Sequence, residues 1–264
     1  DPSIYSTSST DCVNIGQSAG ENSDSDSDRS VNIGRFAGED SPGMTDSVSI
    51  GNLAGQDTSG NSSVHIGNQA GRLTVDGGNK VCIGSQAGSA GSRLENSVFI
   101  GPSAGVNMDT GYNSVFIGNA AGQSAHKSHS CVAIGDDAHK ESISSDEGIS
   151  IGRDSMRNSS NSPRNVCIGF KAGTWMTGSA DNIFIGHTSK ATSNGAGPIN
   201  DCILIGRDSK VVAGVTNSTI IGVNQTVSQD NTLVLGTNQD VGIGTTSPDS
   251  KLHVVGDITG QVIS

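Results

Sequence analysis

The residues that could contact a ligand are few, and they lie in segments rich in Ser, Asn, Asp, Gly and Thr. The large side chains of these segments are Tyr112, Trp175, Met108 and Met176, and we expect them to contact a receptor. Aromatic rings on loops are common platforms for sugars and proteins. Trp175, the only tryptophan, and its neighbour Met176 form the strongest candidate contact patch. A ring that caps a local apolar cluster is an equal alternative.

Catalytic chemistry has weaker support. Acidic pairs such as Asp136-Asp137 and Asp146-Glu147 occur in the same segments, but the carboxylates of a glycosidase must face each other across a cleft. Gly-x-Ser-x-Gly, the usual setting of an activated serine, occurs at residues 16–20 and 101–105, but there it belongs to a short motif that recurs along the whole chain. We therefore predict no catalytic residue and no enzyme, with cleavage of a polysaccharide as the alternative.

One acidic run could bind a metal ion. Asp24, Asp26 and Asp28 alternate with serine, and carboxylate oxygens are ligands of Ca²⁺. The glycine-spaced pattern of known calcium loops is absent, so a solvated loop is favoured. The sequence predicts no metal site and no cofactor.

These candidate residues lie between copies of one short motif. Residues 97–105 read SVFIGPSAG, and residues 114–122 read SVFIGNAAG seventeen positions later. The glycine after the isoleucine serves as a marker, and most intervals between markers are 17 residues. The thirteen marker glycines are Gly16, Gly34, Gly51, Gly67, Gly84, Gly101, Gly118, Gly135, Gly152, Gly169, Gly186, Gly206 and Gly222. A short fixed period of this kind is typical of a solenoid.

The motif predicts a strand followed by two turns. Val or Ile recurs three positions before the marker (position −3) and Ile one position before it (position −1), which is the alternation of a half-buried strand. The marker suits a corner without room for a Cβ. A small residue at +3 and glycine at +4 suit a second corner. We expect an all-β, parallel β-solenoid of about 13 coils over residues 12–227, after a lead-in at 1–11 and before a β-rich neck at 228–264.

Position −2 carries the prediction of assembly. If −3 and −1 form the coil core, pleating points −2 outward. That column becomes apolar along the chain, and an exposed apolar stripe suggests a partner surface. We therefore predict a homotrimer, with scattered exposed side chains as the alternative. Metal binding by His65 at the trimer axis is a less favoured alternative. The predicted interface residues are His65, Phe99, Phe116, Phe184, Leu204 and Ile221.

Composition excludes other classes of partner. The net charge of −11 argues against nucleic acid, because phosphate binding needs clustered Lys and Arg. No apolar run approaches the ~20 residues of a membrane helix, so we expect no membrane insertion. The five cysteines are odd in number and far apart, and we expect small buried thiols rather than a disulfide framework. They are Cys12, Cys82, Cys131, Cys167 and Cys202.

Two resemblances follow from these motifs. The repeat SVFIGxxAG resembles the SVAIGxxA repeat in YadA-like heads of trimeric autotransporter adhesins, which implies a trimeric, left-handed parallel β-roll. The stretch GIGTTSPDSKLHVVGDITG at 242–260 is similar to a segment of viral tail-fibre and appendage proteins. In those proteins the segment precedes a C-terminal chaperone that trimerises the fibre and then cleaves itself off. The second resemblance implies that residue 264 lies about where such a chaperone begins, and no protease residue is carried over.

Together these features favour a structural and receptor-binding segment of a viral tail fibre or appendage. We expect a homotrimer that attaches to a host cell-surface glycan or protein and contacts other virion tail components. Three chains that present stacked loops would add weak contacts through avidity. The expected location is the virion, after assembly in the host cytoplasm. The alternatives are a trimeric autotransporter adhesin head on a bacterial surface and a polysaccharide-degrading tail spike.

Overall fold

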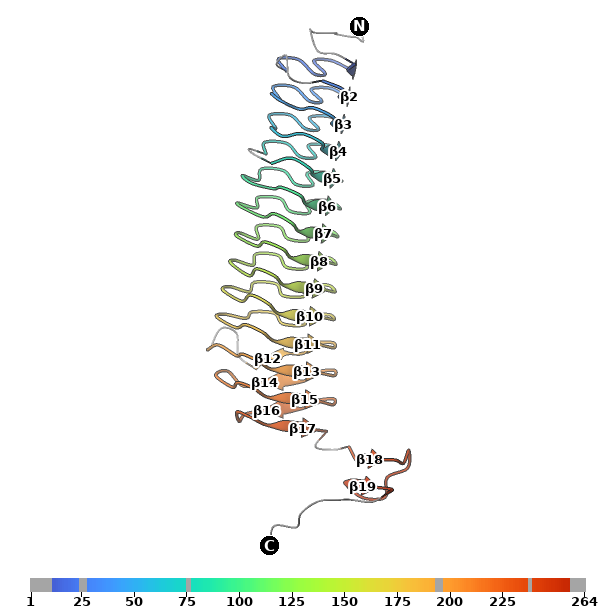
Figure 1. Cartoon of the computed structure of the whole chain (residues 1–264), viewed down its shortest axis with the longest axis vertical. Helices are drawn as coiled ribbons and strands as arrows, with labels where there is room; N and C mark the ends of the chain where they lie inside the picture. Colours follow the sequence, from blue (N-terminus) through green and yellow to red (C-terminus); the bar gives the residue numbers. More distant parts are fainter. Residues whose placement is uncertain (1–10, 24–27, 75–76, 193–196, 237–238, 257–264) are drawn as a thin grey trace.

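The structure, a computed structural model, describes residues 11–23, 28–74, 77–192, 197–236 and 239–256. These residues form a tall stack of coils, one for each repeat, with the strands directly above one another (Figure 1). We number the coils 1 to 13 by their marker glycines. Asp24 and Asp26 of the acidic run and residues 1–10 of the predicted lead-in lie outside the described residues.

One long parallel sheet runs along the stack. Neighbouring strands pair in register, so that each repeat position lies over the same position of the next coil, as Phe99 does over Phe116. Its fourteen strands are β1 (Val13–Ile15), β2 (Val31–Ile33), β3 (Val48–Ile50), β4 (Val64–Ile66), β5 (Val81–Ile83), β6 (Val98–Ile100), β7 (Val115–Ile117), β8 (Val132–Ile134), β9 (Ile149–Ile151), β10 (Val166–Ile168), β11 (Ile183–Ile185), β13 (Ile203–Ile205), β15 (Thr219–Ile221) and β17 (Leu233–Leu235). The predicted parallel β-solenoid with a 17-residue repeat is confirmed.

Two smaller sheets occur near the C-terminal end. Strands β12 (Lys190–Ala191), β14 (Lys210–Val211) and β16 (Thr226–Val227) form a short parallel sheet in the last coils. Strands β18 (Val241–Ile243) and β19 (Leu252–Val254) pair only with each other, beyond β17 (Figure 1). The stack therefore continues to β17 before the chain leaves it. No helix of the described ranges has the length and hydropathy of a membrane span.

The marker glycines have no room for a side chain. Gly101 has a φ of +127°, which favours glycine, and a Cβ added to it would lie 2.5 Å from the carbonyl oxygen of Gly118 in the next coil. Gly84 meets Gly101 in the same way, at 2.7 Å. The corner of each coil therefore rests directly on the backbone of the next corner, as the repeat predicted.

The predicted orientation of the strands is wrong. In all thirteen coils the middle strand residue, at position −2, is buried, whereas the residues at −3 and −1 are partly or largely exposed. Phe99 and Phe116 are fully buried and their rings stack with centroids 5.6 Å apart. The coil core is therefore built from position −2 together with the alanines at +3, and the Val and Ile columns face outward.

The glycine at +4 makes space for the buried side chain at −2. A Cβ on Gly105 would collide with the ring of Phe99. In coils 8 and 9 the sizes are exchanged: Ala133 at −2 is matched by His139 at +4, and Ser150 by Met156, with both larger side chains fully buried. The two positions share one narrow interior, and close packing requires their volumes to compensate.

Hydroxyl groups at position −4 satisfy the backbone where each strand begins. The Ser114 hydroxyl accepts a hydrogen bond from the backbone N–H of Cys131 in the next coil and lies within 3.1 Å of the Tyr112 carbonyl oxygen as a donor. Asn165 and Asn182 repeat this pattern in coils 10 and 11 with their amide groups. Buried polar groups therefore gain partners, and these small polar residues fix the start of each strand.

Candidate functional site

The most extensive candidate site is an apolar face formed by the outward residues of β1 to β11, β13 and β15. Position −3 is Val or Ile except for Thr219 in coil 13, and position −1 is always Ile. In Val13, Ile15 and Ile221 the exposed fraction is 45–47%. With strands ~4.8 Å apart, thirteen coils make a continuous strip roughly 60 Å long. We call this strip the apolar face.

The predicted trimer-interface residues divide between the two sides of the strand. His65, Phe99, Phe116, Phe184 and Leu204 are fully buried inside their own chain, so their prediction as interface residues is wrong. Ile221 alone lies on the apolar face, because in coil 13 the inward residue is Ile220. The sequence thus predicted an apolar column on a strand, but the outward columns are those at −3 and −1, which are Val or Ile except for Thr219.

The predicted receptor contacts are also divided. The side chains of Trp175 and Tyr112 are exposed, with exposed fractions of 44% and 43%. Met108 and Met176 are buried in the coil core, so they cannot contact a receptor. Each methionine fills space beside a glycine: a Cβ on Gly111 would meet the Met108 methyl group, and one on Gly173 would lie 3.2 Å from that of Met176. The two aromatic rings remain candidates.

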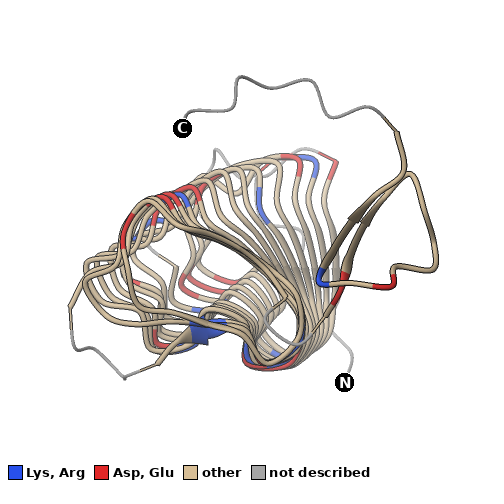
Figure 2. Cartoon of the chain, turned by 90° about the horizontal axis from the view of Figure 1, so that it is seen from below, with Lys and Arg blue, Asp and Glu red and all other residues tan. Residues whose placement is uncertain are grey.

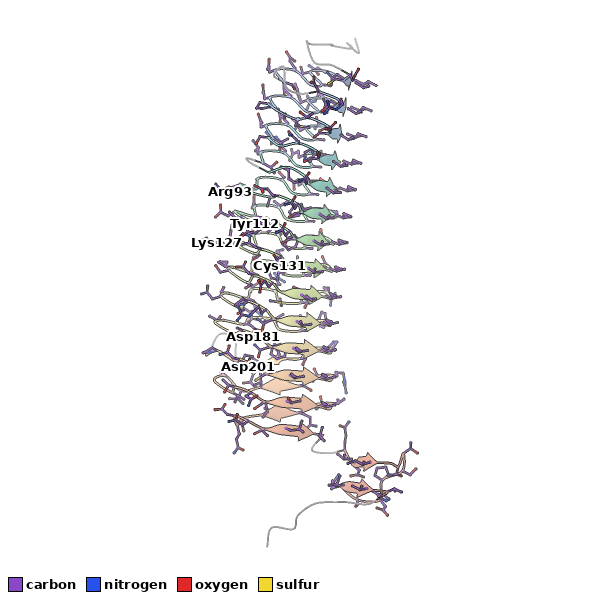
Figure 3. The ribbon with its side chains drawn as sticks, in the orientation of Figure 1. Arg93, Tyr112, Lys127, Cys131, Asp181 and Asp201 are labelled. Atoms are coloured by element: carbon purple, nitrogen blue, oxygen red, sulfur yellow. The ribbon has the colours of Figure 1, made fainter. Side chains whose placement is uncertain are left out.

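Tyr112 lies in a small polar and aromatic patch. Its ring stacks on His129 of the next coil with centroids 3.9 Å apart. Figure 3 places Arg93, Tyr112 and Lys127 together on the side of the rod away from the strand arrows. Neither Arg93 nor Lys127 forms an ion pair within the described part of the chain. Trp175 occupies a different repeat position, so the two rings do not form one ladder.

Two histidines are enclosed in the coil core. Burial and, as the smaller cause, the nearby ammonium group of Lys80 together lower the pKa of His65 to about 3. Burial lowers the pKa of His139 to about 4, and its ring nitrogens lie 3.1 Å from the Ser150 hydroxyl and 3.3 Å from that of Ser128. Both rings are therefore neutral at pH 7. A metal ion bound by His65 on a trimer axis does not fit, because the side chain points into its own coil.

Most of the cysteine thiols are buried, and Asp137 of one acidic pair takes part in ion pairs. Four of the cysteines are buried, as predicted, and Cys12 is half-buried. Burial raises the pKa of Cys82 and Cys131 to about 12, so neither is a thiolate at pH 7. Asp137 pairs with Lys140 at 3.1 Å and with Arg157 at 3.4 Å. Among the described residues no group of three His, Cys, Asp or Glu side chains could hold a metal ion.

Stacked side chains form ladders along the coil corners. Arg29 pairs with Asp46 at 2.6 Å, and Arg164 pairs with Asp181 at 2.7 Å, each between neighbouring coils. Figure 2 shows the acidic and basic residues gathered at the turns of the coils, with long uncharged stretches between them. Charged corners therefore border the apolar face in some of the coils, as Arg29 and Asp46 do in coils 2 and 3.

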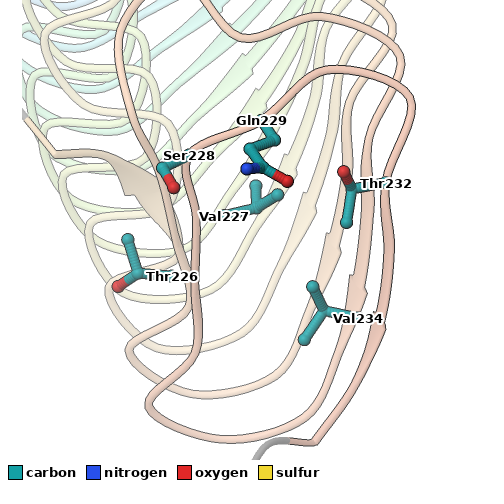
Figure 4. A pocket seen from close by; sticks show the side chains of 6 residues that line it. All are labelled: Thr226, Val227, Ser228, Gln229, Thr232 and Val234. Carbon is teal, nitrogen blue, oxygen red and sulfur yellow. The ribbon is translucent and has the colours of Figure 1, made fainter.

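The hollows on the rod are small. One, of about 170 Å³, lies beside the last coil (Figure 4) and is lined by Thr226, Val227, Ser228, Gln229, Thr232 and Val234. Another, of about 250 Å³, is lined by Asp40, Pro42, Asp57, Thr58, Ser59 and Thr74. Pockets for small molecules usually reach roughly 300–1,000 Å³. Flat surfaces and loops are therefore better candidates for binding than these hollows.

No family model matches the chain, and no curated protein matches it. Among solved structures, the crystal structure of the collagen-binding domain of the Yersinia adhesin YadA is similar at 21% sequence identity. The match covers 67% of this chain and 79% of that chain, with a TM-score of 0.38. A likeness at this score carries no argument, and the β-solenoid rests on the strand register described above.

Proposed function

We propose that the chain is the rod of a homotrimeric attachment protein. The observation that carries this proposal is the apolar face, which runs along every coil. Soluble monomers rarely expose a continuous apolar patch larger than a few hundred Å². A second copy of the chain offers the same face with the same 4.8 Å strand spacing. Association of copies therefore removes the face from water along its whole length.

Three parallel chains suit this face better than an open arrangement. Each chain turns its flat face toward a common axis, so that the Val and Ile columns of all three meet there. A closed ring of identical subunits leaves no apolar face uncovered, whereas a non-closing contact would form filaments. The corners of the coil at the two ends of each strand then lie between neighbouring chains.

Attachment occurs through the loops that remain on the outside. Trp175 and Tyr112 are exposed on turns, where a rigid scaffold commonly carries binding residues. Three copies of each loop in one particle turn weak single contacts into strong binding through effective concentration. The partner is a glycan or protein of a host cell surface.

The proposed setting of the rod is a viral tail fibre or appendage, in which the rod also joins other tail components. The amino-acid sequence of residues 242–260 supports this setting. The second candidate is the head of a bacterial trimeric adhesin, supported by the SVFIG repeat. The coding sequence that follows residue 264 separates them, because a chaperone domain indicates the fibre and a coiled-coil stalk with a membrane anchor indicates the adhesin.

The rod acts without catalysis in this proposal. The acidic pairs support it, since Asp137 is neutralised by Lys140 and Arg157 and Asp146 accepts the backbone N–H of His129. Neither acidic pair lines the two hollows described above, whereas cleavage of a glycoside requires two carboxylates that face each other across a cleft. Incubation with capsular polysaccharides tests this point, and a progressive fall in polysaccharide length would refute it.

Binding to intact cells tests the attachment role. The labelled protein is applied to a panel of bacterial and animal cells and to a printed glycan array. We expect saturable binding to some of these surfaces that falls at least tenfold when Trp175 or Tyr112 is changed to alanine. Arg29→Ala, an exposed change that leaves both rings in place, is the matched control. Binding that is unchanged in both aromatic variants would contradict the proposed contact sites. Absence of binding to every surface tested would contradict the attachment role.

A further inference from the structure

The apolar face has two edges. The residue at position −5 begins the turn into each strand, and its column forms the N-terminal edge of the face. The residue at position +1 follows the marker glycine, and its column forms the C-terminal edge. Both columns are mostly exposed, because the chain turns at each of them.

The two edges carry opposite charges in coils 9 and 12, an acid and a histidine in coil 11, and a basic and an aromatic residue in coil 10. The residues of the N-terminal edge are Glu147, Arg164, Asp181 and Asp201, and those of the C-terminal edge are Arg153, Phe170, His187 and Arg207. In coils 4 to 7 both edges are uncharged: Ser62, Asn79, Asn96 and Asn113 on one side, and Asn68, Ser85, Pro102 and Asn119 on the other. Coils 1, 3 and 8 carry a charge on one edge only, and coil 2 has like charges, Arg29 and Arg35, on its two edges. Opposite charges on the two edges of one coil are thus confined to coils 9 to 12.

Four of these charged side chains, those of Glu147, Arg153, Asp201 and Arg207, have distant or no ion-pair partners within a single chain. Arg207 reaches only its neighbour Asp208, at 3.6 Å, and Arg153 reaches Asp154 at 3.9 Å, while both arginine side chains remain 61% exposed. Glu147 and Asp201 form no ion pair within the described residues. Within the same segment Arg164 already pairs with Asp181 at 2.7 Å, and Arg153 lies over the Phe170 ring of its own chain at 4.5 Å. Glu147, Asp201 and Arg207 are therefore the charges of coils 9 to 12 with the weakest partners inside the chain.

Symmetry identifies that partner. Rotation about an axis parallel to the rod leaves the height of every coil unchanged and brings the C-terminal edge of one chain to the N-terminal edge of the next. An antiparallel pairing instead brings like edges together. Opposite charges at the same height therefore fit parallel copies only.

We propose that the C-terminal edge of one chain pairs with the N-terminal edge of its neighbour at coils 9 to 12. Arg153 meets Glu147 of the next copy, His187 meets Asp181, and Arg207 meets Asp201. In coil 10, Arg164 meets the Phe170 ring. This pairing rests on the proposed trimer and adds which edges touch and in which register.

The pairing is sensitive to register. A slip of one coil in one direction places Arg153 opposite Arg164, and a slip in the other direction places His187 opposite Arg164. The apolar face packs alike in all of these registers, because Val and Ile recur along it from coil to coil. Like-charge contacts in wrong arrangements and opposite-charge contacts in the right one are the usual means of fixing an alignment. Coils 9 to 12 thus act as the alignment segment of the rod.

Cross-linking between chains tests the contact directly. In the double variant Glu147→Cys, Arg153→Cys the two new thiols lie on opposite edges of one chain, so a disulfide joins neighbouring chains. Four of the native cysteines are buried and do not compete. We expect covalent trimers on a non-reducing denaturing gel after mild oxidation. Arg153→Cys with Arg164→Cys, which matches a rod slipped by one coil, is the control and stays uncross-linked.

Charge reversal gives an independent test. Arg153→Glu with Arg207→Glu places acids on both edges, and we expect the concentration at which the trimer half-dissociates to rise roughly tenfold or more. Adding Glu147→Arg and Asp201→Arg exchanges the two edges and restores the wild-type value. Arg93→Glu with Lys127→Glu changes the net charge equally but away from both edges, and leaves the value unchanged.

The outcomes distinguish this pairing from the trimer itself. A wild-type protein with the mass of three chains but no specific cross-link, or reversal without an effect or without rescue, overturns the edge pairing and leaves the trimer in place. A wild-type protein with the mass of one chain defeats the proposed trimer.

Discussion

Phe99 and Ile100 are adjacent in β6, and the structure assigns them opposite roles. Phe99 is fully buried and stacks on Phe116 with centroids 5.6 Å apart. Ile100 lies on the apolar face, half-buried in a single chain. A change at Phe99 should therefore weaken the coil, and a change at Ile100 should weaken association of the chains.

The size of the first effect follows from burial. Truncation of a buried phenylalanine to alanine costs about 3–5 kcal/mol, because the lost transfer free energy is added to that of the cavity. The neighbours of Phe99 in its own coil are Gly105 and Ala104, which are too small to fill the space. We expect Phe99→Ala to lower the free energy of local opening around β6 by about 3 kcal/mol or more.

Hydrogen exchange followed by mass spectrometry measures this local effect. A loss of about 3 kcal/mol makes the amides of β5 to β7 exchange roughly a hundredfold faster, since 1.4 kcal/mol is a factor of ten. Those of β1 and β13 should change little, because coils interact with their nearest neighbours. Ile100→Ala, a truncation at the adjacent residue, is the control. We expect this variant to retain the circular dichroism of the wild-type protein and to lower the affinity between chains of the proposed trimer. Unchanged exchange in Phe99→Ala would refute the inward orientation of position −2.

Three further predictions follow. The pKa values of His65 and His139, about 3 and about 4 against the ordinary 6.5, mean that the unfolded chain binds more protons below pH 6.5. Stability that is present above pH 6.5 is therefore lost as the pH falls, by roughly 2 kcal/mol per histidine between pH 7 and pH 5. Denaturant titrations at both pH values measure this loss in the free energy of unfolding, and His65→Phe should remove about half of it. A variant that loses as much stability between pH 7 and pH 5 as the wild-type protein would contradict the burial of His65. Gly101→Ala should prevent normal stacking of coils 6 and 7, because its Cβ meets the Gly118 carbonyl. Gly43→Ala, where nothing lies within 4 Å of the new Cβ, is the control, and equal thermal stability of the two variants would count against the corner contact. Trp175→Ala should reduce binding to cells without changing the mass of the particle, as measured by light scattering, because the ring is on the outer surface.

The repeat allowed the fold to be predicted in some detail. The spacing of the marker glycines predicted the number of coils and the strands. It also predicted the tight corner, which the contact between Gly101 and Gly118 explains. The exposure of Trp175 and Tyr112 also agreed with their place between motifs. These features depend on local chain geometry, and the sequence repeats that geometry thirteen times.

The orientation of the strands could not be predicted from the alternation of residues. A constant Val or Ile at −3 and −1 was interpreted as the coil core, because buried strand residues are often β-branched. Under the proposed association of chains, the constant columns are those that match another chain. The inside of a coil tolerates variation as long as volumes compensate.

One signal in the sequence does indicate the inward position. Ala133 at −2 is paired with His139 at +4, and Ser150 with Met156, whereas Phe99 is paired with Gly105. Such reciprocal sizes show that −2 and +4 share a space. The buried methionines Met108 and Met176 were missed for a different reason: they lie in polar segments, and only the path of the chain shows that these segments cross the coil interior.

The mass of the particle in solution tests the role of the apolar face most directly. Light scattering should give three times the 26.7 kDa chain mass for the wild-type protein. The double variant Ile100→Asp, Ile117→Asp places charges on that face and should give the mass of one chain, with the β-sheet circular dichroism retained. A wild-type mass of one chain, or a variant that keeps the mass of three, would contradict association through the Val and Ile columns.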